Sequence, residues 1–229
     1  MQQIFKVSDL WKSTFPGASV GILVMRQVTN PATCEPLEAQ KQALESEIRQ
    51  RFSGGERSVI KMLPTIQAYN NYYRPFKKSY HVQLQLESIA FKGKSIPSVA
   101  SLVEAMFMAE VKNMLLTAGH DLDVLQLPLT LKVSDGNEQY VILRGLEQPL
   151  AAGDMYITDT QGIISSIIYG PDQRTHIRTE TRNALFVVYA PAGIDPQAVS
   201  AHLQDISRNV RLVTPQAQEE ILHVFRADD

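Results

Sequence analysis

Histidine, cysteine and carboxylate side chains are the groups from which metal or acid–base chemistry could be built in this chain. There is one cysteine, Cys34. Three residues, His120, Asp121 and Asp123, stand close together in the sequence, but such neighbours rarely face one centre unless the backbone turns. The spacing therefore predicts no metal site. The five histidines are scattered along the chain, at His81, His120, His176, His202 and His223.

Several kinds of catalysis are excluded by missing motifs. The chain has neither a Walker phosphate loop nor a Gly-x-Gly-x-x-Gly dinucleotide fingerprint, so no cofactor is expected. Gly-x-Ser-x-Gly is also absent, which excludes the nucleophile elbow of an α/β-hydrolase. Cys34 lies before a predicted helix with no histidine near it in sequence, so its thiol is expected to be inert.

A segment rich in aromatic and basic residues is the local candidate for a nucleic-acid contact. Residues 72–80 read Tyr-Tyr-Arg-Pro-Phe-Lys-Lys-Ser-Tyr, and residues 74–94 hold five Lys or Arg against one acid. Rings that stack on bases and cations that meet phosphates suit RNA. A helix end and loop that only face solvent would have the same composition. The RNA-binding candidates are Arg74, Lys77, Lys78 and Ser79.

The composition of the whole chain limits the partners. Its 229 residues include 22 Lys or Arg and 24 Asp or Glu, so the net charge is −2 and any RNA contact must be local. Hydrophobic residues at 44% and charged residues at 20% are typical of a folded globular protein. No signal peptide and no apolar run of about 20 residues is visible, so we expect a cytoplasmic protein without a membrane partner.

Hydrophobic periodicity indicates which elements must position these groups. The helix predicted near the middle of the chain is apolar on most faces and is expected to be central, with Met106 and Met108 filling gaps in the core. Asp195 and Pro196 suit the start of a C-terminal helical extension over residues 195–225. The predicted helices before that extension span residues 36–52, 58–70 (broken at Pro64) and 97–116.

After the central helix the period changes to two, which predicts strands. Residues 118–123 are expected to form a turn, and Asp135-Gly136 is expected to close a hairpin between residues 125–133 and 140–143. Because helices and strands are grouped rather than alternating, we predict an α+β fold in a single domain, residues 1–229. The other predicted strands span residues 19–25, 155–157, 163–169 and 184–189.

Six short motifs occur in a characteristic order: Ile96-Pro97, Leu102-Val103-Glu104, Gly119-His120-Asp121-Leu122-Asp123, Gly153-Asp154, Tyr156-x-x-Asp159-x-x-Gly162 and Arg174-Thr175-x-Ile177-x-Thr179-Glu180-Thr181-x-Asn183. Together they resemble the tRNA-editing domain of the phenylalanyl-tRNA synthetase β subunit, formed by its third and fourth B modules. The resemblance covers residues 15–190. Since the synthetase subunit is much longer, the chain is similar to freestanding relatives of that domain. The resemblance implies a layered β/β/α sandwich.

The resemblance also implies a reaction, the hydrolysis in trans of the ester in a mischarged tRNA, with tRNA or aminoacyl-tRNA as the partner. An aminoacyl ester is already activated, so such a site needs to position water and stabilise an oxyanion. On this basis the catalytic candidates are Arg174, Thr181 and His120. The substrate-binding candidates are Gly119, Phe107, Gln173, Thr175 and Thr179.

Each candidate also has a structural role that the sequence leaves open. Arg174 could clamp a phosphate or carboxylate, or it could form a salt bridge. His120 could act as an acid or base near neutral pH, or it could be a hydrogen-bonded structural histidine. The threonine hydroxyls could position water or cap a turn. Two carboxylates are expected to brace the turn, Asp121 and Asp123.

Three positions depart from the synthetase pattern. Phe107 stands in place of an Asn, Ala118 in place of a His, and Gln173 in place of the acid that recognises the tyrosine hydroxyl. All three bear on the pocket, which the resemblance puts between residues 119–120 and 173–181 with a positively charged rim. Either the substrate differs or hydrolysis is lost. The alternatives are a non-catalytic module that binds RNA, an amino acid or a small metabolite, and a scaffold protein with a closed or polar-filled cleft.

Overall fold

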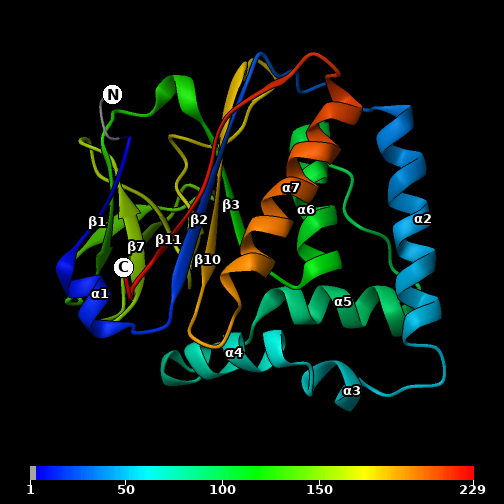
Figure 1. Cartoon of the computed structure of the whole chain (residues 1–229), viewed down its shortest axis with the longest axis horizontal. Coiled ribbons are helices and arrows are strands. Elements are labelled where there is room, and N and C mark those ends of the chain that lie inside the picture. Colours follow the sequence, from blue (N-terminus) through cyan, green and yellow to red (C-terminus); the bar gives the residue numbers. More distant parts are fainter. Residues whose placement is uncertain (1–3) are drawn as a thin grey trace.

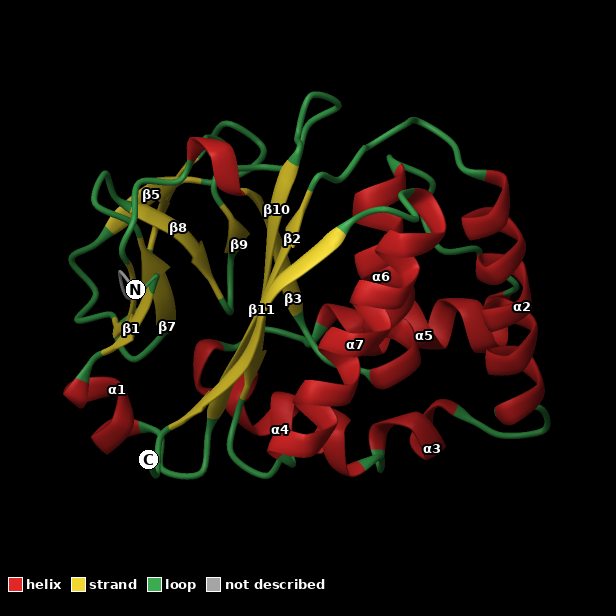
Figure 2. Cartoon of the chain, turned by 45° about the horizontal axis from the view of Figure 1, so that its top comes forward, coloured by secondary structure: helices red, strands yellow, loops and turns green. Residues whose placement is uncertain are grey.

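The computed structural model of the chain describes residues 4–229. Two β-sheets and a group of helices form successive layers, with the larger helices beyond the central sheet (Figure 1). Figure 2 shows the same separation of strands from helices in a second view. The predicted α+β class and β/β/α layering are confirmed.

The central sheet has four antiparallel strands in the order β11-β2-β10-β3. β2 and β10 are buried along nearly their whole length because helices cover one face of the sheet and the second sheet covers the other. This double burial explains why both strands are continuously apolar rather than alternating. The strands span Ser19–Arg26 (β2), Thr117–Asp121 (β3), Asn183–Ala190 (β10) and Gln218–Arg226 (β11).

The second sheet has the order β1-β4-β7-β8-β9, in which only the β1–β4 pair is parallel. A separate hairpin of two short strands, β5 and β6, lies beside it. The strands span Phe5–Val7 (β1), Leu129–Val133 (β4), Gln139–Val141 (β5), Glu147–Pro149 (β6), Met155–Thr158 (β7), Ile163–Ser166 (β8) and Gly170–Pro171 (β9).

Two helices pack on the central sheet, α6 (Ser101–Asn113) and α7 (Pro196–Val213), and α2 (Glu35–Arg51) packs against both from outside (Figure 1). Lys41 of α2 joins α6 through a buried ion pair, with its Nζ 2.8 Å from Oε2 of Glu104. The remaining helices are α1 (Asp9–Thr14), α3 (Arg57–Lys61), α4 (Pro64–Tyr73) and α5 (His81–Lys92). None of the helices within residues 4–229 is long and apolar enough to cross a membrane.

Close packing of α7 on the sheet depends on Gly21 in β2. A Cβ at this position would lie 2.7 Å from Cγ1 of Val199 and 2.9 Å from Cδ1 of Leu203. The start of α7 agrees with the sequence prediction, since the side chain of Asp195 accepts a hydrogen bond from the backbone N–H of Gln197. The helix ends at Val213.

Four local predictions were wrong. The expected turn at 118–123 is largely β3, whose buried residues pair with β10. The last part of the expected helical extension, residues 218–225, lies in β11, because pairing there satisfies the outer edge of β2. Asp135-Gly136 closes no hairpin between β4 and β5, since β4 pairs with β7 and β5 pairs with β6. The central helix begins at Ser101, so Pro97 precedes it.

Candidate functional site

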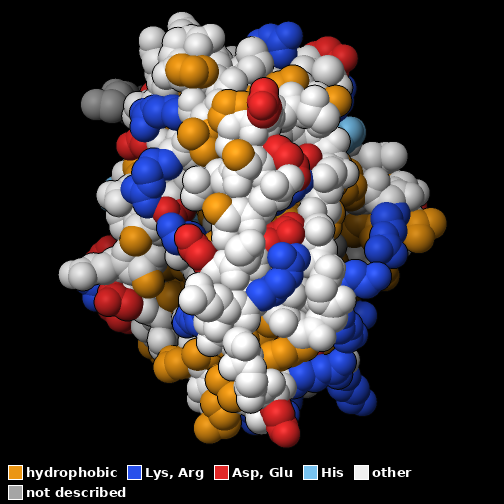
Figure 3. Space-filling view, turned by 90° about the vertical axis from the view of Figure 1, so that its right-hand side faces the viewer, with side chains coloured by type: hydrophobic (Ala, Val, Ile, Leu, Met, Phe, Trp, Pro, Cys, Tyr) orange, Lys and Arg blue, Asp and Glu red, His pale blue; other side chains and the backbone are white. Residues whose placement is uncertain are grey.

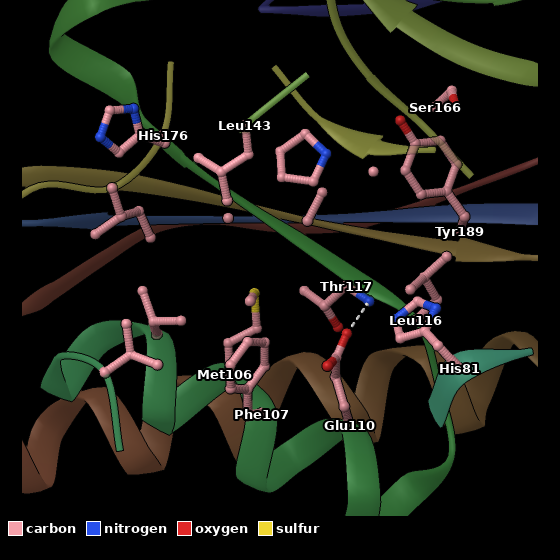
Figure 4. A pocket seen from close by; sticks show the side chains of 17 residues that line it. His81, Met106, Phe107, Glu110, Leu116, Thr117, Leu143, Ser166, His176 and Tyr189 are labelled. Atoms are coloured by element: carbon pink, nitrogen blue, oxygen red, sulfur yellow. Dashed lines mark hydrogen bonds between the residues drawn. The ribbon is translucent and has the colours of Figure 1, made fainter. Parts of the chain in front are cut away.

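A pocket with a volume of about 400 Å³ lies between α6 and β3 on one side and residues 166–177 on the other. Its wall is mainly apolar, and Leu143 from the β5–β6 connection closes part of it (Figure 4). Pockets of this size and character hold small molecules. The main apolar side chains are Val103, Met106, Phe107, Leu116, Leu143 and Ile177.

Gly119 of β3 sets the depth of the pocket. A Cβ at this position would lie 2.8 Å from Cδ1 of Ile177 and 3.2 Å from Sδ of Met106. Both of these residues line the pocket, so the missing side chain lets them approach the strand. Any larger residue here would have to displace the pocket wall.

The polar end of the pocket is formed by Glu110 of α6, which is 1% exposed. The backbone N–H of Thr117 donates to its Oε1 at 2.7 Å, the contact drawn in Figure 4. Burial raises the pKa of Glu110 from 4.5 to about 8, and the bond from Thr117 opposes that rise. The carboxyl group is therefore mostly protonated at neutral pH while the pocket is empty. The one signal of this site in the sequence is an acid within an apolar helix.

Behind Thr117, a buried histidine contacts its hydroxyl. Nε2 of His202 lies 2.7 Å from Oγ1 of Thr117, and its Nδ1 lies 3.2 Å from Nδ2 of Asn113, which donates to Oδ2 of Asp205 at 2.8 Å. Burial lowers the pKa of His202 to about 3, so the ring is neutral.

His120, an acid–base candidate from the sequence, does not line the pocket. Its ring is fully buried, and Nδ1 lies 2.7 Å from Oγ1 of Thr175, which donates in turn to Asp172. Burial, with a further contribution from the positive charge of Arg174, lowers the pKa of His120 to about 3. The sequence left two roles open for His120, an acid–base group or a structural histidine. A neutral and enclosed ring of this kind has the structural role.

Arg174 takes part in an ion-pair cluster behind β3. Its Nη2 lies 2.9 Å from Oδ2 of Asp159, and its Nε lies 3.7 Å from Oδ2 of Asp172. It is not among the residues that line the pocket. Of the two roles that the sequence left open for Arg174, its contacts with charged groups among the described residues are those of a salt bridge.

The remaining candidates from the sequence either form structural hydrogen bonds or face solvent. Thr181 is buried, donates to Oδ2 of Asp121 at 2.8 Å and accepts from the backbone N–H of Arg178 at 2.9 Å, as a turn cap does. Gln173 and Thr179 are exposed and do not line the pocket.

Some of the residues predicted to form the site do line the pocket. Phe107, Ala118 and Gly119 line it together, so two of the three positions that depart from the synthetase pattern meet there. His176 and Ile177 join them, and Nδ1 of His176 donates to the backbone oxygen of Gln173 at 2.5 Å. The described residues that line the pocket include no Lys or Arg, so the expected positive charge does not lie on its wall.

The RNA-binding candidates lie together elsewhere, in an open groove next to the turn between α4 and α5. Nζ of Lys78 is 5.6 Å from the ring centroid of Tyr169, which precedes Gly170 of the pocket wall. The groove is lined by all four candidates, Arg74, Lys77, Lys78 and Ser79. On the face over α2, acidic and basic side chains are mixed, with basic ones gathered toward the lower right edge of Figure 3.

Comparisons with known proteins found a distant similarity in structure. No protein-family model matches the chain, and no curated protein matches it. A solved structure, an N-terminal fragment of the phenylalanyl-tRNA synthetase β subunit from Pyrococcus horikoshii, is similar with a TM-score of 0.47 and 11% identity. The match covers 95% of this chain and 54% of that fragment, so the chain spans about half of the fragment's length. A similarity at this level carries no information on activity.

Proposed function

We propose that this protein is a binding module. Its ligand is a small molecule, or one part of a larger molecule, and has an apolar body about the size of an amino acid. The observation that carries the proposal is the apolar pocket of about 400 Å³ with the buried carboxyl of Glu110 at its polar end. Apolar walls supply binding energy through the area they remove from water, and a single polar group fixes orientation. The open pocket argues against a pure scaffold role.

A thermal-shift series with free amino acids and simple aromatic compounds tests this function. A ligand that binds only the folded state raises the melting temperature, and the rise grows with the logarithm of the ligand concentration above its Kd. We expect increases for apolar amino acids and aromatic compounds, and none for aspartate or lysine. If no compound in the series changes the melting temperature, the proposal is wrong.

The second candidate function is hydrolysis of a mischarged tRNA in trans, in keeping with the motif resemblance. The nearness of the groove around Lys78 to the pocket favours it, because an RNA end could reach the pocket from there. Since Arg174, Thr181 and His120 are engaged elsewhere, hydrolysis would depend on groups at the pocket such as Thr117 and His176.

A panel of mischarged tRNAs separates the two functions. Turnover of one aminoacyl-tRNA by the wild-type protein, kept in Arg174→Ala and weakened in the Lys77→Glu/Lys78→Glu variant, would establish the editing function with a pocket-based mechanism. Turnover lost in Arg174→Ala would instead restore the role that the resemblance assigned to this arginine. An editing synthetase serves as the positive control in the same assay. If it is active and this protein turns over no tRNA, only the binding function remains.

A further inference from the structure

Buried carboxylates in this protein follow a rule that Glu110 breaks. Within residues 4–229, seven of the nine buried Asp and Glu side chains have a Lys or Arg nitrogen within 4.0 Å. The two exceptions are Glu110 and Asp154. The seven that follow the rule are Glu45, Glu87, Glu104, Asp121, Asp159, Asp172 and Asp205.

The two exceptions differ in their surroundings. Oδ1 of Asp154 accepts a hydrogen bond from the hydroxyl of Tyr72 at 3.0 Å, its Oδ2 is buried without a hydrogen-bond partner among residues 4–229, and the residue does not line the pocket. Glu110 lines the pocket, and its Oε2 makes no hydrogen bond to any residue from 4 to 229. Of the two, only Glu110 can therefore receive a partner that enters from outside.

Within the described part of the chain, the groups around Glu110 include no Lys or Arg. The hydroxyls of Tyr69, Tyr73 and Tyr80 have raised pKa values, mainly because of burial, so they remain neutral. Two histidines, His81 and His176, line the same pocket, and burial lowers the pKa of His81. His202, on α7, is neutral as well. An isolated buried carboxylate is costly, and without a partner the group takes up a proton instead.

The rest of the pocket suits a cation with an apolar body. The aromatic side chains of Phe107 and Tyr189 line it together with Met106 (Figure 4). Aromatic faces attract cations, and a carboxylate next to them completes the charge balance. Because the pocket wall holds no Lys or Arg, an entering ammonium group would meet no repulsion from them.

We propose that the ligand of this pocket is an apolar amine whose ammonium group pairs with the Oε2 side of Glu110 while its body lies against Met106 and Phe107. This inference rests on the proposed binding function. Pairing would also release the proton that Glu110 holds in the empty pocket.

Three probes of nearly equal shape test the amine: 2-phenylethylamine, 2-phenylethanol and ethylbenzene, each titrated by calorimetry at pH 7. We expect the wild-type protein to bind the amine about tenfold or more tightly than the alcohol. Glu110→Gln should abolish that preference, so that the amine binds no more tightly than the alcohol. The matched control Asp154→Asn, which removes the other buried carboxylate without a cation, should keep the preference.

A second measurement needs no variant. With ¹³C-labelled glutamate, the carboxyl carbon of Glu110 should move to the chemical shift of an ionised group when the amine binds, and not when the alcohol binds. Alcohol and ethylbenzene binding without amine preference, or with no ionisation of Glu110, overturns the amine inference and keeps the proposed function. Absence of binding by all three probes overturns both.

Discussion

The backbone N–H of Thr117 donates a hydrogen bond of 2.7 Å to Oε1 of Glu110, and this contact joins β3 to α6 at the polar end of the pocket. It holds one oxygen of a carboxyl group that is 1% exposed. The other oxygen has no hydrogen-bond partner among residues 4–229. The strand and the helix therefore present to the pocket a fixed carboxyl group with one free oxygen.

The depth of the pocket depends on Gly119. In Gly119→Ala we expect the new Cβ, 2.8 Å from Ile177, to push the wall inward and to weaken binding of 2-phenylethanol by about tenfold. The matched control is Gly21→Ala, where the Cβ would meet Val199 at 2.7 Å on the α7 side of the sheet. Both variants should lose about 1–3 kcal/mol of unfolding free energy, but only Gly119→Ala should lose affinity. Equal affinity losses in both would contradict this account of the pocket.

The pKa of Glu110 predicts a pH dependence of stability. Its pKa is about 8 in the folded protein and 4.5 in an ordinary environment, so the folded state holds the proton more tightly. The stability from this group is complete below pH 4.5 and is lost as the pH rises through 8. Compared with Glu110→Gln, the wild type should lose up to about 1.4 kcal/mol per pH unit across this window. Urea unfolding of both proteins between pH 4 and 9 measures the difference, and parallel curves would refute it.

Arg174 should matter for stability and not for ligand affinity. Arg174→Ala removes the partner of the buried Asp159 carboxylate, and because the arginine side chain is 34% exposed we expect a loss of about 1–3 kcal/mol. Arg178→Ala is the milder comparison, since Arg178 is 45% exposed and 3.8 Å from Asp121. Denaturant unfolding and calorimetry on the folded variants check this. A tenfold loss of ligand affinity in Arg174→Ala would show that the arginine acts at the site after all.

The contact between α2 and α6 rests on a buried ion pair. Lys41→Met would leave Glu104 buried without its cation, so we expect a loss of about 3–5 kcal/mol. The double variant Lys41→Met/Glu104→Met removes both charges and should recover most of that loss. Thermal unfolding of the two variants compares them, and a double variant no more stable than the single one would exclude the pair as the cause.

Many of the helices and strands could be predicted from the sequence because their signals are local, whereas the layering was implied by the resemblance. Long apolar runs marked β2 and β10, and helical periodicity marked α2 and α6. β3 and β11 were missed because their strand state comes from partners distant in sequence. Gly119, His120 and Asp121 have the composition of a turn, yet they are buried through pairing with β10.

The candidate site was predicted only in part for a similar reason. The order of the motifs drew attention to Phe107, Ala118 and Gly119, which do meet in the pocket. Polar residues near them in sequence, such as His120 and Arg174, look reactive, but alternate side chains on a strand face opposite ways, so His120 lies behind the sheet surface that Gly119 presents. Glu110 was missed because the sequence does not show whether an acid in an apolar helix is buried or lines a pocket.

The most direct test of the binding function is an NMR titration of the methionine methyl groups with 2-phenylethylamine and 2-phenylethanol. Met106 lines the pocket, whereas the buried Met25 and Met155 do not. The account predicts a saturable shift of the Met106 methyl signal with at least one probe, while the Met25 and Met155 signals stay in place. A Met106 signal that does not move with either probe, or three signals that drift together without saturation, would contradict a ligand site between α6 and β3.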